Sequence, residues 1–311
     1  MARVASLQTK HGKAFEWVVA SRISSITGGT LIESPSLAQG RLSFDSLPSE
    51  LKNIQFASAE GAVQHIMKLR EFEDFDHSKT TIRLTSDVDG QSGDVRDVIV
   101  TDGIQTLGIS CKNNHRAFKH SRLSSKIDFV KKWNLNKDGA SDEYWKNVIP
   151  IFNELSRLEI DSQGESLWSQ IPNKANEIYN PLLSAFEFEI TRLLTNEFID
   201  SRLIAKNFID YVVGKNDFYK IIATKKEVEI LGFNFHNTLK VNKSNYPSKI
   251  HSIERNGESL TTTILRFHEG HTFSFRIHNA SSRVEASLKF DIQALSLPSS
   301  QIYTHHIRLE L

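Results

Sequence analysis

The sequence predicts an α/β protein with a mixed sheet flanked by helices, a large and mostly helical insertion, and a β-rich C-terminal region. Three observations support this prediction. Short apolar runs bounded by polar turns occur between residues 80 and 112, which is typical of strands. The stretch from about 143 to 214 carries apolar residues at helical spacing. From about residue 240 onward, short β-type runs return between polar and glycine-containing turns.

The composition is that of an ordinary folded protein and excludes several functional classes. The chain has 311 residues, of which 39% are hydrophobic and 24% charged, so it can form one large domain or two ordinary ones. The net charge of +1 neither requires nor excludes a nucleic-acid partner. A single cysteine, Cys111, rules out an internal disulfide. No apolar run approaches the roughly 20 residues that span a bilayer, so we expect a cytoplasmic protein with no membrane partner.

The N-terminal part is predicted to contain two helices and then three strands. In order, these are helices over 13–26 and 57–75 and strands over 80–84, 97–100 and 107–112. Gly28 and Gly29 are expected to end the first helix. Residues 30–56 show no clear period, and a polar turn is expected over 86–92.

The remainder of the chain is predicted to be basic, then helical, then β-rich. A basic helix is expected over 117–133 and a mostly helical segment over 143–214. The strands expected after it cover 219–223, 227–235, 261–267, 272–278 and 287–295. There is no low-complexity linker, so the domain boundary near residue 236 is a soft one.

Asp97 and Lys112 are the most informative pair of residues. The aspartate opens one predicted strand and the lysine closes the next, so a hairpin would bring both to one end of the sheet. Side chains alternate along a strand, so Ser110 and Lys112 should share a face while Cys111 points the other way as a small buried group. A carboxylate can hold Mg²⁺, and a nearby lysine can orient an attacking water, which is what metal-dependent phosphodiester hydrolysis needs.

The sequence alone does not decide which residues would bind the metal. Asp97, Asp94 and Cys111 are the candidate metal ligands, and Glu16 and a backbone carbonyl are further options for the second ligand. Asp97, Lys112, Asp94 and Glu16 are the candidate catalytic residues. The alternative interpretation is a surface turn with ordinary charged residues, with Glu16 as a solvated helix residue.

These residues resemble the PD-(D/E)xK nuclease superfamily, in which an aspartate heads one strand and a (D/E)-x-K motif lies on the next. Asp97 matches the first acid and Lys112 the lysine, whereas Ser110 occupies the position of the second acid. The S-C-K variant is similar to that of the type II restriction endonucleases of the HaeIII type. The runs that carry this resemblance are 92–98, 110–115, 119–123, 276–285 and 287–291.

The resemblance implies a restriction-endonuclease-like fold, with a catalytic domain over 1–235 and a β-rich DNA-recognition region over 236–311. It implies Mg²⁺-dependent cleavage of double-stranded DNA at the GC-only site GGCC, and a cognate DNA methyltransferase that protects host DNA. A cut on both strands suggests two sites acting together, and therefore a homodimer. Two alternatives remain: a structure-specific repair or junction nuclease on the same core, and an inactive DNA-binding protein, which Ser110 would favour.

Basic residues mark the predicted DNA-facing parts. On a helix, residues 119, 122 and 126 would share one face and form a track for phosphates. Arg276 and Arg283 are predicted to read guanine, because arginine donates bidentately to O6 and N7. The full set of candidate DNA contacts is Arg116, Lys119, His120, Arg122, Lys126, Arg276, Asn279 and Arg283. Surface ion pairs, and a turn role for Asn279, are the alternatives.

Overall fold

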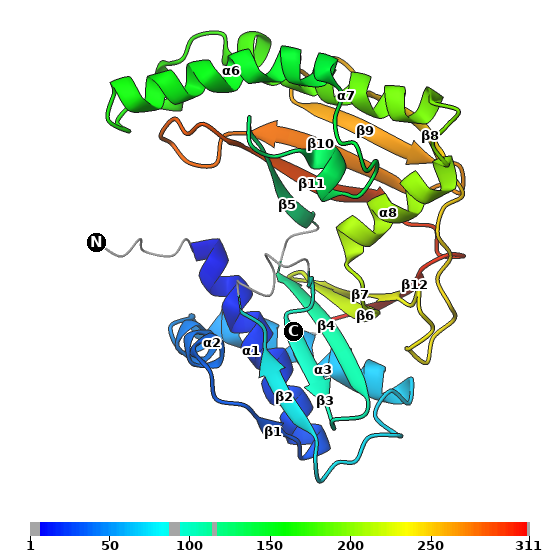
Figure 1. Cartoon of the computed structure of the whole chain (residues 1–311). Helices are drawn as coiled ribbons and strands as arrows, with labels where there is room; N and C mark the ends of the chain where they lie inside the picture. Colours follow the sequence, from blue (N-terminus) through cyan, green and yellow to red (C-terminus); the bar gives the residue numbers. More distant parts are fainter. Residues whose placement is uncertain (1–6, 87–93, 114–116, 310–311) are drawn as a thin grey trace. The chain divides into compact units, whose positions relative to one another are not determined.

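The structure, a computed structural model, describes residues 7–86, 94–113 and 117–309 and divides the chain into two compact units (Figure 1). The first unit consists of Met1–Arg116, Val213–Asn245 and Ser299–Leu311, and the second of Ala117–Val212 and Tyr246–Pro298. This division differs from the predicted boundary near residue 236. The helical segment shares a unit with the β-rich C-terminal region, and the last strand joins the first sheet.

A seven-stranded mixed sheet forms the first unit. Its strands are β1 (Thr30–Leu31), β2 (Thr81–Leu84), β3 (Val98–Thr101), β4 (Thr106–Asn113), β6 (Phe218–Ala223), β7 (Glu227–Phe233) and β12 (Tyr303–Arg308). Their order is β1-β2-β3-β4-β6-β7-β12, in which β1–β2 and β4–β6 are parallel and the other neighbours antiparallel. The sheet confirms the predicted mixed α/β class, and the β3–β4 pair confirms the predicted hairpin.

Two helices pack on one face of this sheet. The helices α1 (Leu7–Thr27) and α3 (Ser49–Lys68) contribute Phe15 and Val63 to a core shared with alternate strand residues such as Ile109. All three side chains are fully buried. Burying apolar surface stabilises a fold by about 25 cal/mol per Å², so this core fixes the position of α1 on the sheet.

A third helix, α2 (Pro35–Asp45), lies where the sequence shows no clear period. Ser34 caps this helix, because its hydroxyl accepts a hydrogen bond from the Leu37 amide at 3.1 Å. Gly40 allows α2 to approach α1 closely, since a Cβ there would lie 2.8 Å from the Cβ of Trp17. The helix therefore depends on a cap and a close contact rather than on an apolar stripe.

A five-stranded antiparallel sheet forms the second unit. Its strands are β5 (Ala117–Leu123), β8 (Ile250–Arg255), β9 (Thr262–Phe267), β10 (Thr272–His278) and β11 (Leu288–Ser296), in the order β5-β11-β10-β9-β8. Its helices are α5 (Phe129–Lys132), α6 (Asp142–Asp161), α7 (Asn180–Thr195) and α8 (Ser201–Val213), with a 3₁₀ turn at Trp168–Gln170 and a π-helix at Ala175–Tyr179. The predicted helical segment and the strands from residue 261 onward are thereby confirmed.

Aromatic side chains join these helices to one face of the five-stranded sheet. The ring centroid of Phe186 on α7 lies 4.8 Å from that of Phe290 on β11. The ring of Phe208 on α8 lies 5.2 Å from that of Phe273 on β10. Aromatic pairs at such distances add to the free energy of burial, so one face of this sheet is the core of the unit.

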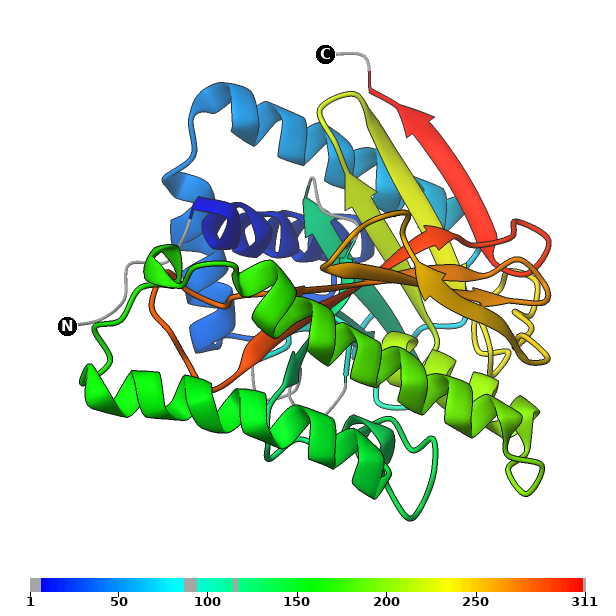
Figure 2. The ribbon, with the colours of Figure 1, turned by 90° about the horizontal axis from the view of Figure 1, so that it is seen from above.

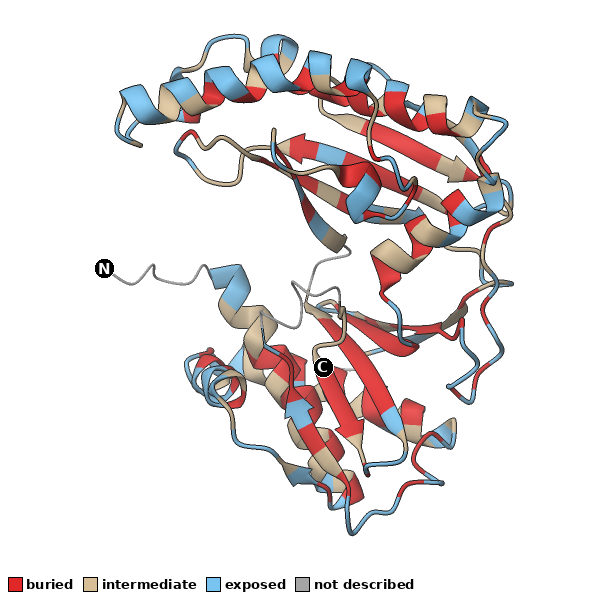
Figure 3. Cartoon of the chain, in the orientation of Figure 1, coloured by how far each residue is buried: buried red, intermediate tan, exposed pale blue. Residues whose placement is uncertain are grey.

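The helices α6 and α7 are amphipathic and run side by side (Figure 2). On α6 the buried residues Tyr144, Val148, Phe152 and Leu155 recur at helical spacing. Figure 3 shows the resulting pattern, in which buried and exposed residues occupy opposite sides of these helices. No helix within the described ranges is both long and apolar enough to cross a membrane.

The structure contradicts the predicted basic helix over 117–133. Residues 117–123 form β5, and only 129–132 are helical. On β5 the Nζ of Lys119 donates to the backbone oxygen of Tyr211 at 2.7 Å, and Ser121 Oγ lies 2.6 Å from the Tyr211 hydroxyl. Because these two covered side chains are polar, the strand lacks the apolar alternation by which a strand is predicted from sequence.

Candidate active site

Asp97 and Lys112 meet at the end of the β3–β4 hairpin. The Nζ of Lys112 lies 3.1 Å from Oδ2 of Asp97. The same oxygen accepts hydrogen bonds from the Ser110 hydroxyl at 3.0 Å and from the Cys111 amide at 2.6 Å. The Asp97 amide in turn donates to the backbone oxygen of Ile109 at 2.8 Å. The predicted proximity of the aspartate and the lysine is therefore confirmed, and three donors hold the carboxylate in one orientation.

Ser110 acts on Asp97 as a hydrogen-bond donor. Its side chain is buried at 3% exposure and lies on the same strand face as Lys112. A hydroxyl at this position adds a donor to the Asp97 carboxylate, whereas an acid would add a second negative charge. The structure thus gives Ser110 a positioning role in place of the charge that the superfamily pattern has there.

Cys111 contributes its backbone amide to the site, and its side chain belongs to the core. The thiol is buried among the apolar residues that α1 and α3 cover. Burial raises the pKa of the Cys111 thiol well above its ordinary value, and the charges of Asp97 and Glu16 raise it further. A protonated thiol is a poor ligand for Mg²⁺, which prefers oxygen. The geometry therefore does not favour the predicted role of this side chain in metal binding.

Glu16 supplies a second buried carboxylate from α1. Its Oε2 lies 3.0 Å from Nζ of Lys13, one turn earlier in the helix. Burial raises the pKa of Glu16 to about 7, with a further contribution from the charge of Asp97, against the opposing effects of Lys13 and Lys112. The carboxylates of Glu16 and Asp97 thus place two like charges close together in a largely buried site. A bound cation would stabilise this arrangement.

Lys112 keeps its charge in this environment. Burial alone would lower the pKa of Lys112, but the charges of Asp97 and Glu16 outweigh it and the net pKa is raised. The group is therefore an ammonium ion with 27% of its side chain exposed, between two acids. An ammonium ion so placed can donate to a water or to a phosphate oxygen.

Asp94 pairs with Arg96 in the structure. Arg96 Nε and Nη2 donate to its two carboxylate oxygens at 2.8 and 2.7 Å. Burial would raise the pKa of Asp94, but the hydrogen bonds and charge of Arg96 outweigh it, so the pKa is lowered. Within the described part of the chain, this carboxylate is engaged by Arg96 rather than by Lys112. Asp97 and Glu16 are therefore better placed than Asp94 to hold a metal.

Gly108, on β4, leaves space for the side chain of Arg96. A Cβ at Gly108 would lie 2.1 Å from Cδ and 2.8 Å from Cγ of Arg96. We expect Gly108→Ala to push the arginine away and to break its pair with Asp94, just before Asp97 in the chain. Overpacking of this kind costs about 1–3 kcal/mol. Chemical denaturation should show that loss. Gly12→Ala in α1, where a Cβ meets no atom within 4 Å and φ is not positive, is the control and should show none.

Lys220 is a buried lysine of the site that the sequence analysis does not identify. It lies on β6 directly opposite Ser110, with only 2% of its surface exposed. Burial lowers the pKa of Lys220 well below its ordinary value, and the charge of Lys112 lowers it further, against Asp97 and Glu229. The signal was present in the sequence, because this lysine interrupts an apolar strand, F-Y-K-I-I-A.

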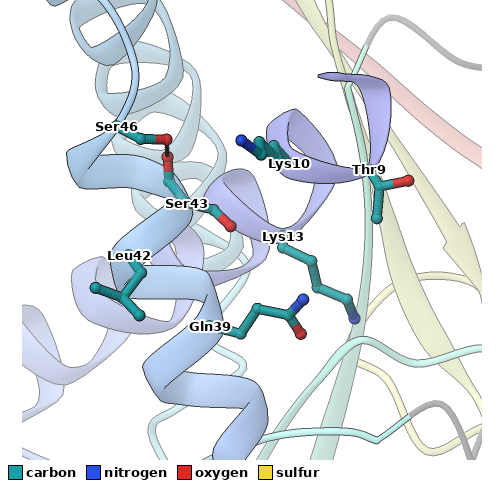
Figure 4. Close-up of a pocket in the computed structure, with 7 residues that line it drawn as sticks. All are labelled: Thr9, Lys10, Lys13, Gln39, Leu42, Ser43 and Ser46. Carbon is teal, nitrogen blue, oxygen red and sulfur yellow. Dashed lines mark hydrogen bonds between the residues drawn. The ribbon is translucent and has the colours of Figure 1, made fainter. Parts of the chain in front are cut away.

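A hollow of about 260 Å³ lies beside Lys13, between α1 and α2 (Figure 4). It is lined by Thr9, Lys10, Lys13, Gln39, Leu42, Ser43 and Ser46. Ammonium and hydroxyl groups of this kind are common contacts of nucleic-acid phosphates. Lys13 belongs both to this hollow and, through its ion pair with Glu16, to the site.

The donor set fits Mg²⁺ better than a softer metal. In the described ranges there is no group of three or more His, Cys, Asp or Glu residues that could hold a metal ion. Asp97 and Glu16 instead offer two carboxylates, and the donors described above engage Oδ2 of Asp97 and Oε2 of Glu16. Mg²⁺ is commonly bound by one or two carboxylates together with water and substrate phosphate.

Sequence comparison decides the family. A family model described as HaeIII restriction endonuclease matches residues 12–298. The chain belongs to the HaeIII restriction endonuclease family. The matched span includes most of α1, both strands of the hairpin and the five-stranded sheet, so Glu16, Asp97 and Lys112 all lie within it.

A curated relative supports the same assignment to the HaeIII family. The chain is 32% identical over 311 residues to a protein named "Type II restriction enzyme HaeIII" from Haemophilus aegyptius. The match covers 94% of this chain and 95% of the relative. No solved structure was found to match the chain. The assignment confirms the predicted resemblance and places the chain among the nucleases.

The predicted DNA contacts of this HaeIII-family chain occupy different environments. His120 and Arg122 alternate with the covered residues of β5, and Arg276 lies on β10 in register with Asp291 of β11. Lys119 instead lies against the ring of Tyr211, with Nζ 4.0 Å from its centroid, and burial lowers its pKa to about 8. Lys119 therefore belongs to the covered face of the sheet.

The remaining predicted contacts lie in turns or outside the described residues. Lys126 follows β5 in a turn closed by Ser124. Asn279 donates to the backbone oxygen of Ser281, as expected for a turn residue. Arg283 pairs with Glu165 at 2.6 Å. Arg116 lies outside the residues that the structure describes, as do most of the residues in the predicted polar turn over 86–92.

Proposed function

We propose that this chain is a type II restriction endonuclease that hydrolyses phosphodiester bonds of double-stranded DNA with Mg²⁺ at the GC-only site GGCC. The observation that carries the proposal is the convergence of Asp97, Glu16 and Lys112 in a member of this family. The site sequence GGCC rests on the family resemblance. A homodimer that cuts both strands, and a methyltransferase as functional partner, belong to the same proposal.

Each residue of the site has a defined task in this proposal. Asp97 and Glu16 would hold Mg²⁺ through carboxylate oxygens, and when bound, Mg²⁺ stabilises negative charge on the phosphate. The Ser110 hydroxyl and the Cys111 amide keep the Asp97 carboxylate in place. The Lys112 ammonium orients the attacking water and stabilises charge that develops on the phosphate oxygens.

Digestion of a plasmid of known sequence in Mg²⁺ tests this proposal. We expect a discrete set of fragments whose mapped ends fall at GGCC on both strands. Mapping the ends reports activity, specificity and cut geometry in one experiment. Cleavage confined to branched substrates would instead identify a structure-specific nuclease. DNA binding without turnover in either Mg²⁺ or Mn²⁺ would identify an inactive binding protein.

A further inference from the structure

One face of the five-stranded sheet is polar where β5, β11 and β10 lie side by side. Along β11 the residues alternate between core positions, such as Phe290 and Ile292, and polar positions on the opposite face. The polar residues that the strand register brings together on this face are His120, Arg122, Arg276, His278, Lys289, Asp291 and Gln293. Five of these residues are basic or can become so, and Asp291 is the single acid among them.

Two histidines hold the carboxylate of Asp291. His120 Nδ1 on β5 lies 2.6 Å from Oδ1, and His278 Nε2 on β10 lies 2.8 Å from Oδ2. The second nitrogen of His278 lies 2.9 Å from the backbone oxygen of Asn279, so both of its ring nitrogens are engaged. The carboxylate is therefore fixed between residues of the two strands that flank β11.

The same contacts keep Asp291 ionised. Burial alone would raise the pKa of Asp291, but the hydrogen bonds and charges of His120 and His278 outweigh it and lower the pKa to about 2. Each oxygen accepts one bond from a histidine, and a carboxylate oxygen has two lone-pair sites. An acceptor therefore remains on a side chain that is 16% exposed.

The ionised carboxylate of Asp291 can accept a hydrogen bond from a base edge, whereas it would repel a phosphate. A carboxylate repels the phosphate backbone, so its presence at the centre of a basic patch would weaken non-specific binding. In the major groove, cytosine presents an N4 amino donor, and guanine presents the acceptors N7 and O6. A carboxylate and an arginine side by side therefore complement a G·C pair.

Arg276 is the arginine in that position. Its Cα pairs in register with that of Asp291 on the neighbouring strand, so the two side chains emerge next to each other on the same face. The side chain is exposed, and it makes no hydrogen bond or ion pair with any residue that the structure describes. It is therefore available to a ligand, unlike Arg283, which is paired with Glu165.

We propose that Arg276 and Asp291 together read one G·C base pair in the major groove, Arg276 at guanine and Asp291 at the cytosine amino group. His120 and His278 are positioning residues that hold the carboxylate. The inference rests on the proposed restriction endonuclease function and names two of its specificity determinants. It assigns to Asp291 a role that the basic residues of this face cannot fill.

Competition binding without divalent metal tests the assignment, because DNA then stays uncut. The probes are a GGCC duplex and duplexes in which each base pair of the site is replaced in turn. The palindrome GGCC contains two distinct G·C positions, the outer and the inner one, each present twice by symmetry. At one of these positions, we expect Asp291→Asn to reduce the preference for the correct base pair by about 5- to 150-fold. At the other position the preference should be retained. Arg276→Ala should lose discrimination at the same base pair as Asp291→Asn, and because Arg276 is exposed this variant should fold normally. Arg157→Ala, which removes an exposed arginine of α6 that pairs with Glu154 and Asp161, should bind as the wild type does.

The outcomes separate this inference from the proposed function. A wild type that shows no preference for GGCC in binding and leaves no ends at GGCC when it digests a plasmid in Mg²⁺ would defeat both. A wild type that prefers GGCC, with Asp291→Asn and Arg276→Ala variants that lose affinity equally for all duplexes, would overturn this inference alone. A uniform gain in affinity for Asp291→Asn would also overturn it, because that result would place the carboxylate beside a phosphate. Thermal denaturation of each variant checks that the fold is intact.

Discussion

Lys112→Ala is expected to reduce the rate of DNA cleavage by about 10²- to 10³-fold. This is the range found when one preorganised hydrogen-bond donor is removed from an active site. The ammonium lies 3.1 Å from Asp97 and is kept charged by two acids. Lys220, the other lysine described at this site, does not replace it, because burial lowers its pKa well below the ordinary value. Binding to DNA should persist, because the residues that we propose for base recognition lie on a different sheet. Single-turnover cleavage and equilibrium binding on the same duplex measure the two effects separately.

A lysine outside the site provides the control for this variant. Lys79 is 71% exposed and forms a surface pair with Asp76, and Lys79→Ala should cleave as the wild type does. Full cleavage by Lys112→Ala would remove this lysine from the mechanism. Equal loss of cleavage and of binding would show that its role lies in holding DNA or the fold.

The hairpin and its residue pair could be predicted because every interaction in it is local. Asp97 and Lys112 are separated by one turn, and strand alternation alone decides which of the intervening side chains share a face. The strand β5 could not be predicted in the same way. Its covered positions hold Lys119 and Ser121, whose polar groups are satisfied by Tyr211, a contact that exists only after α8 has packed.

The other features that the sequence could not predict depend on contacts between residues far apart in the chain or on different strands. Lys220 lies beside Ser110 because β6 pairs with β4 in parallel across an excursion of about a hundred residues. The engagement of Asp94 depends on Gly108 of β4, since that glycine leaves space for Arg96, which lies just before β3. The division into units likewise depends on which sheet each strand joins, as when β12 pairs with β7. Composition and periodicity carry no information on such choices.

Glu16→Gln is expected to stabilise the metal-free protein at pH 8 while it reduces cleavage. The folded protein holds the proton of Glu16 up to about pH 7, whereas the unfolded chain releases it near 4.5. Between these values the folded state binds more protons, so stability falls as the pH rises through this window. Above pH 7 the ionised Glu16 lowers the free energy of unfolding by its full amount, which is up to about 3 kcal/mol at 1.36 kcal/mol per pKa unit. A neutral glutamine removes that cost.

Thermal denaturation of the wild type and of Glu16→Gln at pH 4.5 and pH 8 measures this effect. The two proteins should differ little at the lower pH, and the variant should melt higher at the upper one. Glu258→Gln, which changes an exposed acid in the turn between β8 and β9, should leave both values unchanged. A variant less stable than the wild type at pH 8 would show that the ion pair with Lys13 outweighs the burial of the charge.

Added Mg²⁺ should reduce or reverse the difference in stability between the two proteins. A ligand that binds only the folded state stabilises it by an amount set by its concentration and affinity. The wild type, with two carboxylates, should therefore gain more from Mg²⁺ than Glu16→Gln, which keeps only Asp97. A gain of equal size in both proteins would mean that Glu16 does not hold the metal. The cost of the buried acid in the metal-free protein would then have no compensation in metal binding.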